Sequence, residues 1–287
     1  MTTRTRAATV LTHTRSEQVR PALEALVRAA AREGVTLRFD PDETRKHGLA
    51  ARDGFELDAP IADDVELCVV LGGDGTILRA LRHYAGTGVP VFAVNYGEVG
   101  FLATIDPEPA VLEPGLRAAL AGDFEILRLP AIALETRSGP RLAVNDLAVH
   151  RRRGERVAEL AYAVDGEEVG SVRADGLVVA TPAGSTGYNL ANGGPVMAWG
   201  VEGFAVSFIS PHSLTARALV VAPRDELSVH NRSEAPVDIS LDGRPGGLLS
   251  PGETLTATFA REAATLAQMP GASFYRRLRT TFGRLAS

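Results

Sequence analysis

The stretch that decides the fold is Val65–Leu71 (VELCVVL), followed directly by Gly72–Thr76 (GGDGT). A nearly continuous apolar run of this length is typical of a strand buried on both faces of a parallel sheet. The next residues, Ile77–Arg82, place apolar side chains at helical spacing, so the glycine-rich loop joins a strand to a helix. Open parallel sheets bind ligands at such junctions, outside the carboxyl ends of their strands.

The same alternation of strand and helix extends on both sides of this loop. Upstream, Ala7–Leu11 predicts a strand and Ser16–Arg32 a helix. Downstream, the strand Val89–Val94 is followed by the turn Asn95–Gly100 and by a helix-rich segment that ends near Gly122. The first part of the chain is therefore predicted to be an α/β domain.

After Phe124 the pattern changes to short runs rich in Val, Ile, Leu and Thr, which predict strands. Turn signals separate these runs at Ser138–Pro140, Asp165-Gly166 and Asp242-Gly243, and an Asp-Gly pair favours a tight hairpin. The tail Phe274–Leu285 again has helical spacing and is expected to pack back on the first domain. We predict three parts: 1–123 (α/β), 124–270 (all-β) and 271–287 (C-terminal helix).

Composition excludes several classes of function. The 287 residues are 45% hydrophobic and 23% charged, as in a globular protein large enough for two domains. The net charge of −5 argues against binding to nucleic acid or anionic membranes. No apolar run approaches the roughly 20 residues of a membrane span, and no signal peptide is evident, so we expect a cytoplasmic protein. A single cysteine, Cys68, excludes a disulfide framework and a multi-cysteine metal site within one chain.

The loop Gly72–Thr76 has the features of an anion site with one exception. Glycines allow close approach to a phosphate, and the first amides of a helix are unpaired donors. Asp74 would repel that phosphate unless it serves a hydroxyl group to be deprotonated or a bound Mg²⁺ ion. The alternative is a tight turn in which Asp74 bonds the next amides and Thr76 caps the helix. Because Lys46 is the only lysine and no P-loop motif surrounds it, any phosphate must be held by arginines, amides or a metal.

Two further polar clusters interrupt apolar strands. Asp175–Pro195 joins a strand to a glycine-rich turn in which helix capping explains only one or two of the polar residues, which are Thr181, Ser185, Thr186, Tyr188, Asn189 and Asn192. Asn145-Asp146 lies within the run Leu142–Val149, where one of the two side chains would meet the core unless it had a partner. A turn or bulge is the alternative there. We interpret His212 as a loop residue, Arg151–Arg156 as a solvated strand end and Asp242–Arg244 as a hairpin turn.

Taken in order, these motifs resemble the NAD kinase family. Gly72–Thr76 is similar to the family's phosphate-donor and catalytic loop, and Asn95–Leu102 (NYGEVGFL) to its N-x-G-x-x-G-F-L segment. Asn145-Asp146 resembles its Asn-Glu pair, Asp175–Pro195 its D-G…T-P-T-G-S-T-A-Y…G-G-P signature, and Ile209–Leu214 its I-S-P-H-S-L block. The chain departs from the pattern at Ala183, Gly187, Asp146 and Ile77, where Thr, Ala, Glu and Phe are usual.

The resemblance implies a Rossmann-like N-terminal domain, a C-terminal β-sandwich domain and a homodimer or homotetramer. The implied reaction is Mg²⁺-dependent transfer of a phosphoryl group from ATP to the adenosine 2′-hydroxyl of NAD, giving NADP, with Asp74 as the base. Asn145 and Asp146 would contact ribose hydroxyls. The implied NAD- and phosphate-binding residues are Gly72, Gly73, Asp74, Gly75, Thr76, Arg79, Asn145, Asp146, Arg156, Arg173, Asp175, Thr186, Gly187, Tyr188, Asn189, Leu190, Ala191 and Arg244.

Several alternatives stay open on the sequence. A lipid kinase or a phosphofructokinase-like enzyme also carries a Gly-Gly-Asp-Gly loop, although a lipid kinase should show an apolar or basic surface segment. A dinucleotide-binding regulator without activity is a third possibility. Within the NAD kinase hypothesis, the donor is ATP alone or also polyphosphate. A polar residue at the position of Arg173 goes with preference for NAD over NADH in the family.

Overall fold

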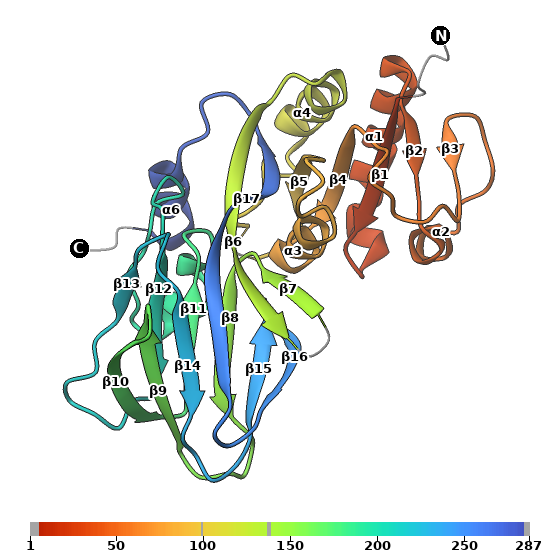
Figure 1. Ribbon diagram of the computed structural model, residues 1–287. Coiled ribbons are helices and arrows are strands. Elements are labelled where there is room, and N and C mark those ends of the chain that lie inside the picture. Colours follow the sequence, from red (N-terminus) through yellow and green to blue (C-terminus); the bar gives the residue numbers. More distant parts are fainter. Residues whose placement is uncertain (1–5, 99, 137–138, 284–287) are drawn as a thin grey trace. The chain divides into compact units, whose positions relative to one another are not determined.

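Figure 1 shows the computed structural model of the chain, which describes residues 6–98, 100–136 and 139–283. The chain forms two compact units. Unit 1 comprises Met1–Arg128 and Ala264–Ser287, and unit 2 comprises Leu129–Ala263. The chain passes from one unit to the other within two long strands, β6 (Glu125–Thr136) and β17 (Thr254–Gln268). Residues 124–128 and 264–270, which the sequence analysis places in the second domain, thus cluster with the first.

Unit 1 contains a parallel sheet. Its strands are β1 (Ala7–Thr12), β2 (Thr36–Arg38), β3 (Phe55–Glu56), β4 (Leu67–Gly72), β5 (Val91–Asn95) and the end of β17. Their order is β3-β2-β1-β4-β5-β17, and every pair is parallel. All residues of β1 and β4 are buried, as a strand covered on both faces requires. The α/β prediction is confirmed.

Helices cover both faces of this sheet. The helices of unit 1 are α1 (Ser16–Glu33), α2 (Pro41–His47), α3 (Asp74–His83), α4 (Pro109–Ala121) and α6 (Phe274–Phe282), of which α6 packs against Phe101 in the segment after β5. Helices α1 and α4 share one core with alternate strand residues such as Val10 and Val69. Thr9 faces the opposite side, where Tyr84, which follows α3, donates a hydrogen bond to its hydroxyl at 2.8 Å. No helix within the described ranges is long and apolar enough to cross a membrane.

Unit 2 is a sandwich of antiparallel strands, as predicted. One sheet has the order β13-β12-β11-β8-β15-β16. Its strands are β8 (Asp146–Arg151), β11 (Gly176–Ala180), β12 (Phe204–Ile209), β13 (Leu219–Val221), β15 (Val237–Leu241) and β16 (Arg244–Leu249). The other sheet contains β6 and β17 with β7 (Gly139–Ala143), β9 (Ala158–Val164), β10 (Glu167–Ala174) and β14 (Leu227–Asn231). Buried residues of both sheets, such as Leu177 and Leu227, form a single core.

The two Asp-Gly turns form as expected. Asp165 and Gly166 have φ angles of 50° and 80°, and Asp242 and Gly243 have φ angles of 48° and 71°. Positive φ at both central residues matches the right-handed twist of the flanking strands. The predicted turn at Ser138–Pro140 includes Ser138, which lies outside the described residues. The polar segment after β11 contains a short 3₁₀ turn, Gly184–Thr186, followed by α5 (Tyr188–Ala191).

The run Leu142–Val149 is not one strand, so that prediction is wrong. It is divided between β7 and β8 by a bend at residues 144 and 145. The alternative of a turn was therefore the better interpretation, and it removes the conflict between two adjacent polar side chains. Asn145 lies in the bend, and only Asp146 begins a strand.

Candidate active site

The predicted phosphate loop begins at Gly72, the last residue of β4, and ends in the first turn of α3. Gly73 is the N-cap of α3, has an extended backbone and contributes no side-chain cap. A Cβ atom on Gly73 would lie 2.9 Å from the Gly97 Cα atom, so the two backbones meet there. A Cβ atom on Gly75 would meet nothing within 4 Å. Gly73 thus serves close packing, whereas Gly75 leaves the positive end of the helix open.

Asp74 is oriented by the segment that follows β5. Its Oδ2 atom accepts a hydrogen bond from the Phe101 N–H at 3.2 Å, and its Oδ1 atom accepts one from the Leu102 N–H at 3.1 Å. The simple turn, in which Asp74 bonds the next amides and Thr76 caps the helix, is wrong, because these donors come from a distant segment and α3 already begins at Asp74. A carboxylate held in this way retains lone pairs that can accept a proton from a hydroxyl group.

The segment that holds Asp74 is itself shaped by Asn95. The Asn95 Oδ1 atom accepts a hydrogen bond from the Gly97 N–H at 3.0 Å, and the Nδ2 atom donates one to Asp106 at 3.1 Å. Gly100 has a φ angle of 62°, and a Cβ atom on it would lie 2.2 Å from the Asn95 Nδ2 atom. Gly100 is therefore required both by backbone conformation and by space.

Arg79 contacts a buried carboxylate that the sequence did not single out. Its Nη2 atom lies 3.3 Å from the Oε1 atom of Glu43, whose side chain is 1% exposed. Glu43 also accepts hydrogen bonds from the Thr12 N–H at 3.0 Å and from Lys46 at 2.8 Å. The single lysine of the chain thus neutralises a buried charge. A contact between Arg79 and a ligand phosphate stays a prediction.

In unit 2 the Asn145-Asp146 pair is held by Asp242. The Oδ1 atom of Asp242 accepts hydrogen bonds from the N–H groups of Asn145 at 2.7 Å and Asp146 at 3.2 Å, and the Oδ2 atom accepts one from Val144 at 3.1 Å. The sequence pattern indicates only a turn position for Asp242. No local signal pointed to this role, because its partners lie almost a hundred residues earlier in the chain.

Three of the predicted site residues line one cavity of unit 2. The cavity has a volume of about 600 Å³ and is lined by Asp146, Asp175 and Tyr188 together with His150, Arg151, Ser240 and other residues of the unit. Asp175 is paired with Arg151, whose Nε atom lies 2.5 Å from its Oδ1 atom. Tyr188 is 43% exposed. Carboxylates and an accessible aromatic ring are suited to sugar hydroxyls and to a flat base.

Several polar residues of Asp175–Pro195 make hydrogen bonds that build the turn. The Thr181 hydroxyl donates to the Val144 carbonyl at 2.6 Å, and the Ser185 hydroxyl accepts from the Met197 N–H at 2.9 Å. The Asn189 side chain donates to the Ser185 and Pro195 carbonyls and is fully buried. These three residues therefore have structural partners within the turn and its surroundings, and a ligand contact of Asn189 stays a prediction.

The remaining predicted positions fall into two groups. Arg156, Arg173 and Arg244 are exposed and lie outside the set of residues that lines the cavity of unit 2. Thr186 and Leu190 are half-buried, and Gly187 and Ala191 are exposed. His212 donates its backbone N–H to the Arg173 carbonyl at 2.7 Å, as befits a loop residue. Roles of these residues in ligand binding stay predictions.

Within the described ranges, no group of three or more His, Cys, Asp or Glu side chains is arranged to hold a metal ion. Mg²⁺ in phosphoryl-transfer enzymes keeps several waters and takes one or two carboxylates together with substrate phosphates. The residues that the structure describes form no resident metal cage, and they fit an ion that would arrive with the donor phosphates.

The two loop glycines give a matched pair of stability predictions. Gly73→Ala is expected to lower the melting temperature by several degrees, because its Cβ would press against the Gly97 backbone. Gly75→Ala is expected to leave the melting temperature unchanged or slightly raised, because the Cβ meets open space and alanine favours a helix. Differential scanning calorimetry of both variants checks this. Equal destabilisation by the two substitutions would contradict the assigned packing.

Asp146 gives a pH-dependent prediction. Burial, and then the charge of Asp242, raise the pKa of Asp146 from 3.8 to about 7. The folded protein therefore holds a proton that the unfolded chain has released, and this contribution to stability is full below about pH 4 and is lost as the pH rises through 7. Asp146→Asn cannot ionise and therefore does not lose stability in this way. The difference in melting temperature, variant minus wild type, should rise between pH 4.5 and pH 8.

The control for this measurement is Asp53→Asn, which alters an exposed aspartate of unit 1. Its melting temperature relative to wild type should change little over the same pH range. A pH-independent difference for Asp146→Asn would show that the Asp146 carboxyl is ionised in the folded protein across this range.

Comparison with known proteins gives a consistent result. Residues 3–123 match the family model of the ATP-NAD kinase N-terminal domain, and residues 144–269 match that of the ATP-NAD kinase C-terminal domain. An NAD kinase of Gemmatimonas aurantiaca is 35% identical over 229 residues, which cover 76% of this chain and 78% of that protein.

Solved structures agree with this match. An NAD kinase from Archaeoglobus fulgidus in complex with ATP superposes with a TM-score of 0.73 and 27% identity, covering 97% of each chain. Yeast NADH kinase complexed with NADH has the same fold, with a TM-score of 0.86, 22% identity and coverage of 100% of this chain and 90% of that chain. On the two domain matches and the identity to a relative over three quarters of its length, the chain belongs to the NAD kinase family.

Proposed function

We propose that this protein transfers the terminal phosphoryl group of ATP to the adenosine 2′-hydroxyl of NAD, giving NADP and ADP. The observation that carries the proposal is the Asp74 carboxylate, which two backbone N–H groups hold at the open N-terminus of α3. A base and an anion-binding helix end lie within one turn of each other. Phosphoryl transfer to an alcohol needs both, because the acceptor must lose a proton while the donor phosphates must be neutralised.

In this mechanism Asp74 orients the 2′-hydroxyl and accepts its proton. The 2′-oxygen attacks the terminal phosphorus in line, a new P–O bond forms, and the bond from that phosphorus to the bridging oxygen breaks to release ADP. Most of the rate enhancement comes from positioning and charge neutralisation. The two amide donors contribute by fixing the carboxylate before the acceptor binds, so that no reorganisation is needed during the reaction.

The donor phosphates are assigned to the backbone N–H groups of Gly73 and Gly75. The Thr76 N–H already donates to the Gly73 carbonyl at 2.9 Å, so a contact from Thr76 would come from its side chain. The first amides of a helix have no intrahelical partners and carry partial positive charge. The open space at Gly75 allows a phosphate to approach the backbone closely. A Mg²⁺ ion carried by the donor would neutralise phosphate charge, and the protein would add few ligands to it.

Recognition of the dinucleotide is assigned to unit 2. The cavity lined by Asp146, Asp175 and Tyr188 offers acceptors for ribose hydroxyls and a ring for stacking. The Asn145 Oδ1 atom is buried and has no hydrogen-bond partner among the described residues, as a group that awaits a ligand donor would be. The bend that carries Asn145 is held by Asp242, so this acceptor is already placed in the folded protein.

One assay tests which phosphoryl donor the protein uses and whether it accepts NADH as well as NAD. Purified protein is incubated with Mg²⁺ and NAD, or NADH, and with ATP or polyphosphate in parallel, and the NADP or NADPH formed is measured with specific dehydrogenases. Formation of NADP from ATP is the expected result. Absence of product with both donors would contradict the proposal and favour a dinucleotide-binding regulator. The homo-oligomeric state and the cytoplasmic location stay predictions.

The base is tested by substitution. Asp74→Asn keeps a group that can accept at least one amide hydrogen bond but cannot accept a proton, so we expect normal folding and a loss of kcat of at least about 100-fold. Steady-state kinetics with NAD and ATP measure this, and Asp53→Asn serves as the control on an exposed aspartate. Turnover within a few-fold of wild type would overturn the assignment of Asp74 as the base.

A further inference from the structure

Helix α6 carries an arginine that the proposed mechanism does not yet use. The Arg277 Nη1 atom donates a hydrogen bond to the Phe101 carbonyl at 2.8 Å and another to the Ala103 carbonyl, and the Nη2 atom lies 3.3 Å from the Gln268 Oε1 atom. Burial lowers the pKa of the Arg277 guanidinium, and the charges of Asp106 and Asp74 oppose this effect. Arg277 therefore fixes the backbone of residues 101–103.

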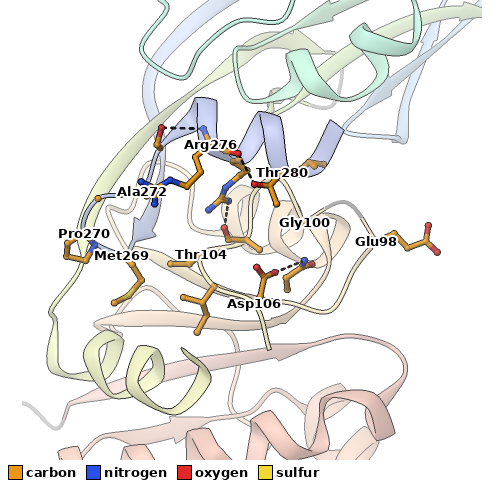
Figure 2. A pocket seen from close by; sticks show the side chains of 16 residues that line it. Glu98, Gly100, Thr104, Asp106, Met269, Pro270, Ala272, Arg276 and Thr280 are labelled. Atoms are coloured by element: carbon orange, nitrogen blue, oxygen red, sulfur yellow. Dashed lines mark hydrogen bonds between the residues drawn. The ribbon is translucent and has the colours of Figure 1, made fainter. Parts of the chain in front are cut away.

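The setting of this contact is a cavity of about 570 Å³ in unit 1 (Figure 2). One side is formed by α6, from which Arg276 and Thr280 are labelled in Figure 2, and the facing side by the segment after β5 with Thr104 and Asp106. Helix α6 thus holds the segment that orients Asp74. Because α6 begins at Phe274, far later in the sequence, the motif Asn95–Leu102 alone does not reveal this contact.

One peptide group connects Arg277 to Asp74. The carbonyl of Phe101 and the N–H of Leu102 belong to the same planar peptide unit, and in a trans peptide they point in opposite directions. The carbonyl accepts from Arg277 at 2.8 Å, and the N–H donates to the Asp74 Oδ1 atom at 3.1 Å. Any rotation of this plane would alter both bonds at once. A cationic donor on the carbonyl also polarises the peptide and strengthens its N–H as a donor.

We propose that Arg277 is a positioning residue for the reaction: it locks the Phe101–Leu102 peptide plane, and this plane sets the direction of the Asp74 carboxylate. The inference rests on the proposed role of Asp74 as the base. Arg277 itself touches neither the acceptor nor the donor in this mechanism. Its effect is expected in kcat, because a misdirected carboxylate leaves ligand binding intact but abstracts the proton less well.

A purely structural role for Arg277 would give a different result. The Phe101 ring contacts the rings of Phe274 and Phe282, with centroid distances of 5.6 Å and 6.0 Å, so α6 stays attached to the segment without the guanidinium. If Arg277 only held the helix in place, its loss would lower stability and leave the turnover of the folded protein unchanged.

The test compares Arg277→Ala and Arg277→Lys with Arg276→Ala, a control on the exposed arginine next to it. In Arg277→Ala we expect kcat to fall at least about tenfold, while the KM values for NAD and ATP stay within about twofold. Arg277→Lys should recover part of kcat, since an ammonium group can donate to one of the two carbonyls. Arg276→Ala should match wild type.

Added guanidinium ion, at concentrations far below those that unfold the protein, should restore kcat of Arg277→Ala and leave Asp74→Asn inactive. If Arg277→Ala does not fold, Arg277→Lys carries the test, with a partial loss of kcat at constant KM. A folded Arg277→Ala with wild-type kcat, or a change confined to KM, would overturn the inference. If Arg277→Ala is fully active and Asp74→Asn is inactive, the positioning role of Arg277 is wrong and the assignment of Asp74 as the base stands. If Asp74→Asn is itself active, the proposed base fails.

Discussion

The pair of hydrogen bonds from the Phe101 and Leu102 amides to the Asp74 carboxylate is the constraint on which the candidate active site of unit 1 depends. An aspartate at the N-cap of a helix ordinarily accepts bonds from the next amides of that helix. Here the N-cap is Gly73, and the carboxylate of Asp74, the first helical residue, accepts from another segment. The close approach of Gly73 and Gly97, the positive φ angle of Gly100 and the bonds of Asn95 all keep that segment where its amides reach Asp74.

Unit 2 uses the same device at its own polar segment. Asp242 accepts three backbone N–H bonds from residues 144–146 and so fixes the bend that presents Asn145 and Asp146. In both units, an aspartate and a loop distant in sequence fix each other, and the glycines next to them allow the backbones to meet. Gly184 plays this part in unit 2, since a Cβ atom on it would lie 2.0 Å from the Asn145 carbonyl oxygen. Polar side chains are thereby placed without relying on flexible loops.

The strands and turns could be predicted from the sequence better than the contacts between side chains. The buried run before Gly72 identified β4, and the Asp-Gly pairs identified two hairpins, because these signals are local. The ion pairs of the buried Glu43 with Lys46 and Arg79 could not be predicted. Nothing in the sequence of Asp40–His47 distinguishes the one buried carboxylate from the exposed carboxylate beside it. The roles of Asp242 and Arg277 depend on pairings between residues far apart in the chain. The turn contacts of Thr181, Ser185 and Asn189 could not be predicted for a related reason: a polar residue that supports a turn and one that contacts a ligand look the same in the sequence.

Amide hydrogen exchange at Phe101 and Leu102, measured by NMR in the wild type and in Asp74→Ala, tests the central claim most directly. If the carboxylate holds these amides, both should exchange at least about tenfold faster in the variant, as expected for loss of a bond to a charged acceptor. The Thr104 amide, which donates to the Ala93 carbonyl at 2.7 Å, should keep its rate and serves as the internal reference. Unchanged protection of Phe101 and Leu102 in Asp74→Ala would contradict the claim that these two bonds orient Asp74.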